Sequence, residues 1–273
     1  ISDMYALIPF ALVVLTLGME SGFFRFCGKC ATPGEKDKVF STAWSVVSAF
    51  AVLFMAVVLM FRQDIAGVTG YSEWPSYIWV VGAIIALDAI TAVPFARLRE
   101  QGKAGRYVLV RVLSVVINVV LCVFFYSTLP SLAESGGVFA SIWNPAYGPG
   151  YVFVANLVAS GAALVMLLPS SLSRTVKPDR NLLGRLFIYC LPLLVSGIAG
   201  TANEFIYRQM IKYLMPAGES MAALGIYGAV VKIGVLLLLF TQMYRLAAEP
   251  YFLSNFKKED FVRTNAEAMK YFI

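Results

Sequence analysis

The chain has 273 residues, of which 59% are hydrophobic and 14% are charged, and its formal net charge is +6. A soluble domain is about half apolar and a quarter charged, so this composition excludes an ordinary soluble protein and favours a membrane protein. The basic residues lie between apolar blocks, where membrane proteins keep their cytoplasmic anchors, which argues against nucleic acid as a partner.

Seven apolar blocks are long enough to cross a bilayer as helices, which takes roughly 20 residues each. They lack the alternating polarity of barrel strands, so we expect an all-α, polytopic transmembrane helical bundle. Turn-forming residues such as Pro33 and Gly34 lie between blocks. In chain order the blocks are 4–26, 39–61, 76–96, 112–133, 151–169, 186–214 and 221–251.

The connections between the apolar blocks are alternately rich and poor in lysine and arginine along the chain. Their numbers are 4, 1, 5, 0, 4, 0 and 5 in the segments 25–38, 62–75, 97–111, 131–149, 170–185, 214–220 and 241–273. Because short basic loops face the cytoplasm, we expect these loops inside, residue 1 outside and a multi-pass protein of a bacterial inner membrane. With residue 1 outside and no initiating Met, we interpret the chain as an internal part of a longer protein.

Catalytic and metal-binding patterns are weak. The sequence has no histidine, no P-loop and no GxGxxG motif, so we expect no enzyme and no cofactor. Cys27 and Cys30 form one CxxC pair, but a zinc site needs four ligands, so a chance pair at a helix end is the favoured interpretation. Cys122 and Cys190 lie within apolar blocks.

Charged residues inside the apolar blocks are the candidate functional residues, because each costs several kcal/mol at the bilayer centre unless it faces protein or water. A cavity with both signs suits a coupled transporter: cations bind phosphate, and acids bind a proton or sodium ion. The candidate cations are Arg25, Arg208, Lys212, Lys232 and Arg245, and the candidate acids are Glu20, Asp88, Glu204 and Glu249.

A structural interpretation stays open for several of these charges. Glu204 with Arg208, and Arg245 with Glu249, are helix neighbours that can neutralise each other. Arg25 and Arg245 can extend to the headgroups, and Asp88 can satisfy backbone groups near the proline at 94. For Asp88 and Lys232 the functional interpretation is favoured.

The sixth block carries a possible hinge. Pro192 removes a helical hydrogen bond, and Gly197 lies close behind it. Bent helices beside the substrate site are common in alternating-access transporters. A static kink is an equally good interpretation of the same residues.

Four segments stand out as motifs: LGMESGFFRF at 17–26, PFARLREQGKA at 94–104, GIYGAVVK at 225–232 and FTQMYRLAAEP at 240–250. They resemble motifs of the oligosaccharide flippases in the multidrug/oligosaccharidyl-lipid/polysaccharide exporter superfamily. The resemblance implies a partial two-lobe exporter fold with about seven spans in this chain. Residues 1–172 would form part of the first lobe, 173–185 a cytoplasmic basic linker and 186–273 the start of the second lobe.

By the same resemblance, the central-cavity charges are Arg25, Asp88, Arg208 and Lys232. The implied function is flipping of undecaprenyl-pyrophosphate-linked oligosaccharide from the cytoplasmic to the outer leaflet, for surface polysaccharide synthesis. Its partners would be the lipid-linked oligosaccharide, membrane lipid and a coupling cation, either proton or sodium. The alternatives are a cation-coupled multidrug exporter of the same superfamily, with Glu20 and Asp88 as ion sites, and a membrane glycosyl- or acyltransferase.

Overall fold

A computed structural model describes residues 2–69, 76–134, 147–148, 150–172, 176–214, 226–227, 229–231, 233–243 and 266. The described residues contain no strand, and six helical segments are long and apolar enough to cross a membrane. The protein is therefore an all-α, multi-pass helical bundle, as the sequence predicts. The spans are Ile8–Cys27, Pro33–Met60, Ser76–Glu100, Ala104–Ala133, Gly150–Leu172 and Arg180–Ala202.

The chain divides into two compact units, Ile1–Ala202 and Asn203–Ile273. The boundary falls inside helix α10 (Arg180–Leu214), which starts in the basic segment 173–185, and the two lobes and the linker stay predictions. Helix α10 begins within that segment because the Asp179 carboxylate accepts hydrogen bonds from the amides of Asn181 and Leu182, at 2.9 and 3.4 Å. In the second unit, the described residues between Ala229 and Met243 are helical and apolar, within the predicted seventh span.

The first predicted block is two helices rather than one. Helix α1 (Ser2–Thr16) and helix α2 (Met19–Cys27) are separated by Leu17 and Gly18, which have φ of 52° and 67°. Gly18 lies tightly against α10, where an added Cβ would stand 3.2 Å from the Leu193 Cβ. Glycine is suited to this position because it takes positive φ without strain and leaves room for the neighbouring helix.

Residues 32–35, where the sequence predicts a turn, form the start of helix α3 (Pro33–Met60). The Thr32 side chain accepts from the Glu35 amide, and the Glu35 carboxylate accepts from the Thr32 amide, which together form a capping box. Pro33 fills the first helical position, where no amide hydrogen is needed. A short helix, α4 (Arg62–Thr69), follows in the segment predicted as a loop.

Helix α5 (Ser76–Glu100) is the most buried span and packs against α1, α3 and α9 (Gly150–Leu172). Pro94 lies inside it and has no amide hydrogen for the Ile90 carbonyl. The Trp44 indole of α3 donates to that carbonyl at 3.0 Å, so the backbone group is satisfied by a neighbouring helix and not by Asp88.

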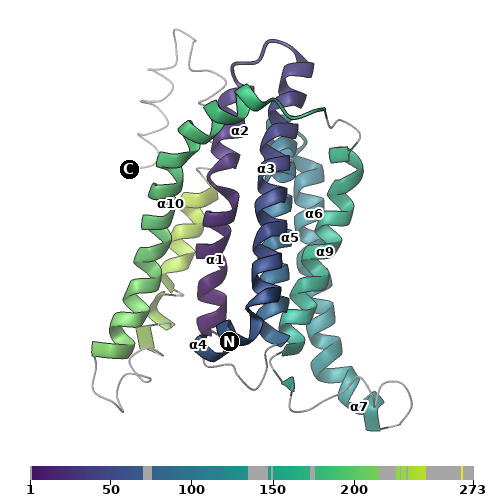
Figure 1. Ribbon diagram of the computed structural model, residues 1–273. Coiled ribbons are helices and arrows are strands. Elements are labelled where there is room, and N and C mark those ends of the chain that lie inside the picture. The colour runs from purple at the N-terminus through teal and green to yellow at the C-terminus, as the bar shows by residue number, and fades with distance from the viewer. Residues whose placement is uncertain are drawn as a thin grey trace. The chain divides into compact units, whose positions relative to one another are not determined.

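Helix α6 (Ala104–Val123) continues through a π-turn, η1 (Phe124–Thr128), into α7 (Leu129–Glu134), and packs on α9. Within the first unit, α2, α5 and α9 end where α3, α6 and α10 begin, and α4 and α7 lie at the opposite end (Figure 1). We call the former the basic end, because the segments 25–38 and 97–111 and the described residues of 170–185 lie there. At the opposite end the Tyr77 hydroxyl donates to the Tyr147 carbonyl at 2.6 Å.

Candidate functional site

Three ion pairs join α2, α3 and α5 at the basic end. Lys36 Nζ lies 2.6 Å from Glu100 Oε1, and Arg99 Nη2 lies 2.7 Å from Glu20 Oε2. The third pair joins Arg97 to Asp37. These six residues, Glu20, Lys36, Asp37, Arg97, Arg99 and Glu100, form what we call the basic-end cluster.

Arg97 is the most enclosed member of the basic-end cluster. Its side chain is 7% exposed, against 21% for its partner Asp37. Its guanidinium also lies 4.1 Å from the centre of the Phe40 ring, in cation–π geometry, and Phe40 stacks on Trp44. We expect this ion pair to hold α5 against α3, because breaking it would leave an uncompensated charge in a largely buried position.

Arg25 and Glu20 lie on the same short helix but have different partners. The Arg25 guanidinium stands 4.2 Å from the centre of the Tyr189 ring on α10, whereas Glu20 is paired with Arg99 on α5. Asp88 lies 11 residues before Arg99, or about 16 Å along the helix. The structure therefore does not bring Glu20 and Asp88 together.

Asp88 instead belongs to a polar site among three helices. Its half-buried carboxylate accepts a hydrogen bond from the buried Ser160 of α9 and lies in the electrostatic field of Arg111 of α6. Asp88 and Ser160 lie at the same depth, each 12 residues, or about 18 Å, from the basic-end terminus of its helix. The Arg111 guanidinium lies 4.1 Å from the centre of the Phe95 ring of α5, so its influence on Asp88 is through its charge.

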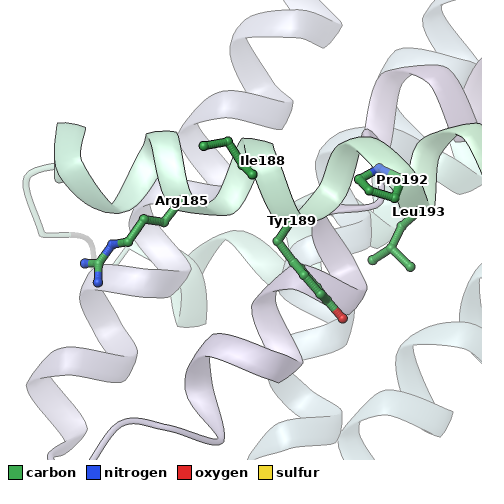
Figure 2. A pocket seen from close by; sticks show the side chains of 5 residues that line it. All are labelled: Arg185, Ile188, Tyr189, Pro192 and Leu193. Carbon is green, nitrogen blue, oxygen red and sulfur yellow. The ribbon is translucent and has the colours of Figure 1, made fainter.

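Pro192 and Gly197 lie in α10, which continues unbroken through both of them. A shallow hollow of about 420 Å³ opens beside Pro192, and all the residues around it belong to α10 (Figure 2). Gly197 packs against α1, where an added Cβ would stand 2.9 Å from Val13 Cγ1. Hinge motion at these residues stays a prediction.

The side chains of the remaining predicted site residues lie outside the described part of the structure. For Glu204, Arg208 and Lys212 only the helical backbone of α10 is described, and Lys232, Arg245 and Glu249 lie beyond the described residues. Their roles stay predictions.

The CxxC pair lies at the end of α2, and both thiols are free. Cys27 is buried, and the Cys30 thiol donates to the Phe26 carbonyl at 3.3 Å. Partial burial raises the pKa of the Cys30 thiol above its ordinary value, and the nearby Glu35 carboxylate raises it further. Cys30 is therefore held as a neutral thiol, which is unlike the low-pKa cysteine of a redox site.

We expect Cys30 to alkylate slowly at pH 8. In a variant whose other cysteines are replaced by serine, the pH giving half-maximal rate with iodoacetamide should lie above 9.0, the ordinary value. Glu35→Gln should move that midpoint to lower pH, because it removes one negative charge that disfavours the thiolate. A midpoint below 9.0 in the folded protein would contradict this description of the thiol.

Sequence reasoning missed the basic-end cluster and the partners of Asp88. The sequence predicts Arg97, Arg99 and Arg111 in a connection between spans, whereas Arg97 and Arg99 lie in the last turn of α5 and Arg111 lies inside α6. One signal was available: Gly102 between two helical patterns marks a helix stop, which places Arg111 well inside the following helix.

Comparison of the chain with protein-family models, with curated proteins and with solved structures finds no match.

Proposed function

We propose that this chain forms part of a transporter that flips undecaprenyl-pyrophosphate-linked oligosaccharide from the cytoplasmic to the outer leaflet of a bacterial inner membrane. The proposal rests on the four motifs that resemble oligosaccharide flippases and on the multi-pass helical architecture. Two of those motifs coincide with structural features: 17–26 spans the α1–α2 break, and 94–104 spans the end of α5 and the start of α6.

The observation that carries the proposal is the position of Asp88 deep inside a membrane span. A carboxylate about 18 Å from the helix end lies near the middle of a bilayer whose core is about 30 Å thick. Charge at that depth is costly, and in membrane proteins it marks substrate or ion pathways. Burial penalises the charged form of Asp88, and the hydrogen bond from Ser160 and the field of Arg111 offset part of that cost.

The orientation follows from the basic end. The basic connections 25–38, 97–111 and 170–185 lie at one end of the first unit, and short basic loops face the cytoplasm. We therefore assign the basic end to the cytoplasm. In the proposed cycle, Arg25, Arg208, Lys232 and Arg245 hold the pyrophosphate while the acyl tail stays in the bilayer, and bending at Pro192 and Gly197 opens the cavity outward.

The test is complementation. The protein, expressed from its complete gene in a strain that lacks its flippase, should restore surface polysaccharide and clear the accumulated lipid-linked oligosaccharide. Failure on both measures with the matching sugar would refute the proposal.

Asp88→Asn should lower the initial flipping rate in the same strain by about tenfold or more, equivalent to about 1.4 kcal/mol on the barrier, because it removes the charge inside the span. Asp64→Asn is the matched control, since Asp64 is exposed on α4. Equal membrane levels of the three proteins exclude a folding defect. Wild-type rate in Asp88→Asn would assign Asp88 to structure alone.

The Asp88 site also supports a second candidate function. The oxygens of Asp88 and Ser160 are the ligand type that a proton or sodium ion takes, which suits a cation-coupled multidrug exporter. Cationic-dye efflux from cells, measured with and without a sodium gradient, separates the two functions. Efflux without restored polysaccharide would favour the exporter.

A further inference from the structure

A basic pocket lies at the basic end between α5, α6 and α9. Its cavity volume is about 330 Å³, and its polar lining consists of Arg97, Gln101, Lys103, Arg106, Ser170 and Ser171. None of the described residues that line it is acidic. It is separate from the Asp88 site, because Asp88 and Ser160 lie about 9 and 14 Å along their helices from the nearest lining residues, Pro94 and Pro169.

The turn between α5 and α6 sets the shape of this pocket. Helix α5 ends in a Schellman arrangement: the Gly102 amide donates to the Arg99 carbonyl at 3.0 Å, and the Lys103 amide donates to the Leu98 carbonyl at 2.9 Å. Gly102 has φ of 66°, which glycine adopts readily. The chain then enters α6 at once, so that Gln101, Lys103 and Arg106 come to line one cavity.

The start of α6 carries positive charge at a position where helices usually carry negative charge. Lys103 occupies the N-cap and makes no side-chain cap hydrogen bond, and the first turn contains no acidic residue. Cations are unfavourable at the positive end of a helix dipole, and the first amides of a helix have no partner within it. Helix α3 begins at the same end with a capping box and Glu35, so α6 lacks the negative charge that its neighbour has.

The α9 side of the pocket supplies hydroxyl groups. Ser170 and Ser171 donate to the Leu167 carbonyl at 2.9 and 3.0 Å, and either can rotate to donate to a ligand oxygen while the other keeps that carbonyl bonded. Arg106 Nη2 reaches the Met166 carbonyl at 3.5 Å, which holds its guanidinium on the α9 side. Guanidinium, ammonium and hydroxyl donors converging at a helix start are the groups that bind phosphate.

The pocket also lies beside a surface suited to lipid. Just beyond its first turn, α6 exposes apolar side chains, among them Val108, Leu109 and Val112. Basic pockets between transmembrane helices at the membrane surface are sites for anionic lipid headgroups. We propose that this pocket binds a phosphate group, supplied either by an anionic phospholipid of the adjacent leaflet or by free phosphate in solution.

The test uses the full chain in a neutral detergent. Phosphatidylglycerol and phosphatidylcholine of equal chain length are titrated and followed by native mass spectrometry. Inorganic phosphate is titrated by calorimetry against chloride at equal ionic strength. Lys103→Gln/Arg106→Gln should weaken phosphate-group binding about tenfold or more, because two cations near the ligand are lost.

The matched control is Lys29→Gln/Lys38→Gln, which removes the same charge from two exposed lysines at the basic end that do not line the pocket. Lys103→Arg/Arg106→Lys should keep binding, and an unchanged unfolding temperature in all variants excludes a folding defect. Selective loss of phosphatidylglycerol identifies a lipid site, and loss of inorganic phosphate binding in the absence of lipid identifies a soluble ligand. Equal binding by wild type and Lys103→Gln/Arg106→Gln, or equal losses in the control pair, overturns the proposal.

Discussion

Arg97→Ala should destabilise the protein by about 3–5 kcal/mol, because it leaves the Asp37 carboxylate in a largely buried position without its cation. It also removes the guanidinium from the face of Phe40, which adds to the loss of packing between α3 and α5. The measurement is the free energy of unfolding of the purified protein in detergent, titrated with a denaturing detergent.

Two variants separate charge from packing at this position. Arg97→Met with Asp37→Asn removes both charges at similar volume, and we expect it to recover most of the lost stability. Lys36→Ala is the matched control, because the Lys36 side chain is 41% exposed and its pair with Glu100 should contribute about 0–1 kcal/mol. A cost for Arg97→Ala no larger than for Lys36→Ala would show that the buried pair does not hold α3 to α5.

The helical bundle was predictable from the sequence because membrane spans are defined by length and apolarity alone. The blocks 39–61, 76–96 and 151–169 lie within α3, α5 and α9, apart from Phe61, which caps α3. The alternation of basic and neutral connections predicts antiparallel neighbours, and the structure places the basic connections of the first unit at one end.

Helix ends were harder to predict, because caps and charges override hydropathy there. The block expected at 112–133 begins eight residues earlier, at Ala104, and the block expected at 186 begins at Arg180. In both places basic residues lie within the first turns of the helix, where apolarity alone predicts a loop. A sequence window that weighs only apolarity stops at the first arginine.

The break at Leu17 and Gly18 and the basic-end cluster depend on contacts between distant segments. Gly18 is close to Cys190, whose thiol donates to the Gly18 carbonyl at 3.5 Å across 172 positions of sequence. Arg97 and Asp37 are 60 positions apart. The sequence shows that such charged residues are present, but it does not show which of them form pairs. It therefore does not predict Arg99 as the partner of Glu20.

The contact between α2 and α10 gives the second large expected effect. Gly22 faces α10 so closely that an added Cβ would stand 2.5 Å from Cys190 Sγ and 3.4 Å from Leu186 Cδ2. Both of those residues are fully buried, so neither has free space to move into. Small residues at helix crossings permit such approach in membranes, where close packing drives helix association.

Gly22→Ala should therefore destabilise the first unit by about 1–3 kcal/mol, measured by the same unfolding titration. Cys190→Ala removes the sulfur that the new methyl group meets, so Gly22→Ala should cost much less in that background, and the coupling between the two sites should be favourable. Gly161→Ala in α9 is the matched control, because an added Cβ there meets nothing within 4 Å. Additive effects of Gly22→Ala and Cys190→Ala would mean that α2 and α10 are not in contact at this position, and the Arg25–Tyr189 contact one turn away would then need independent support.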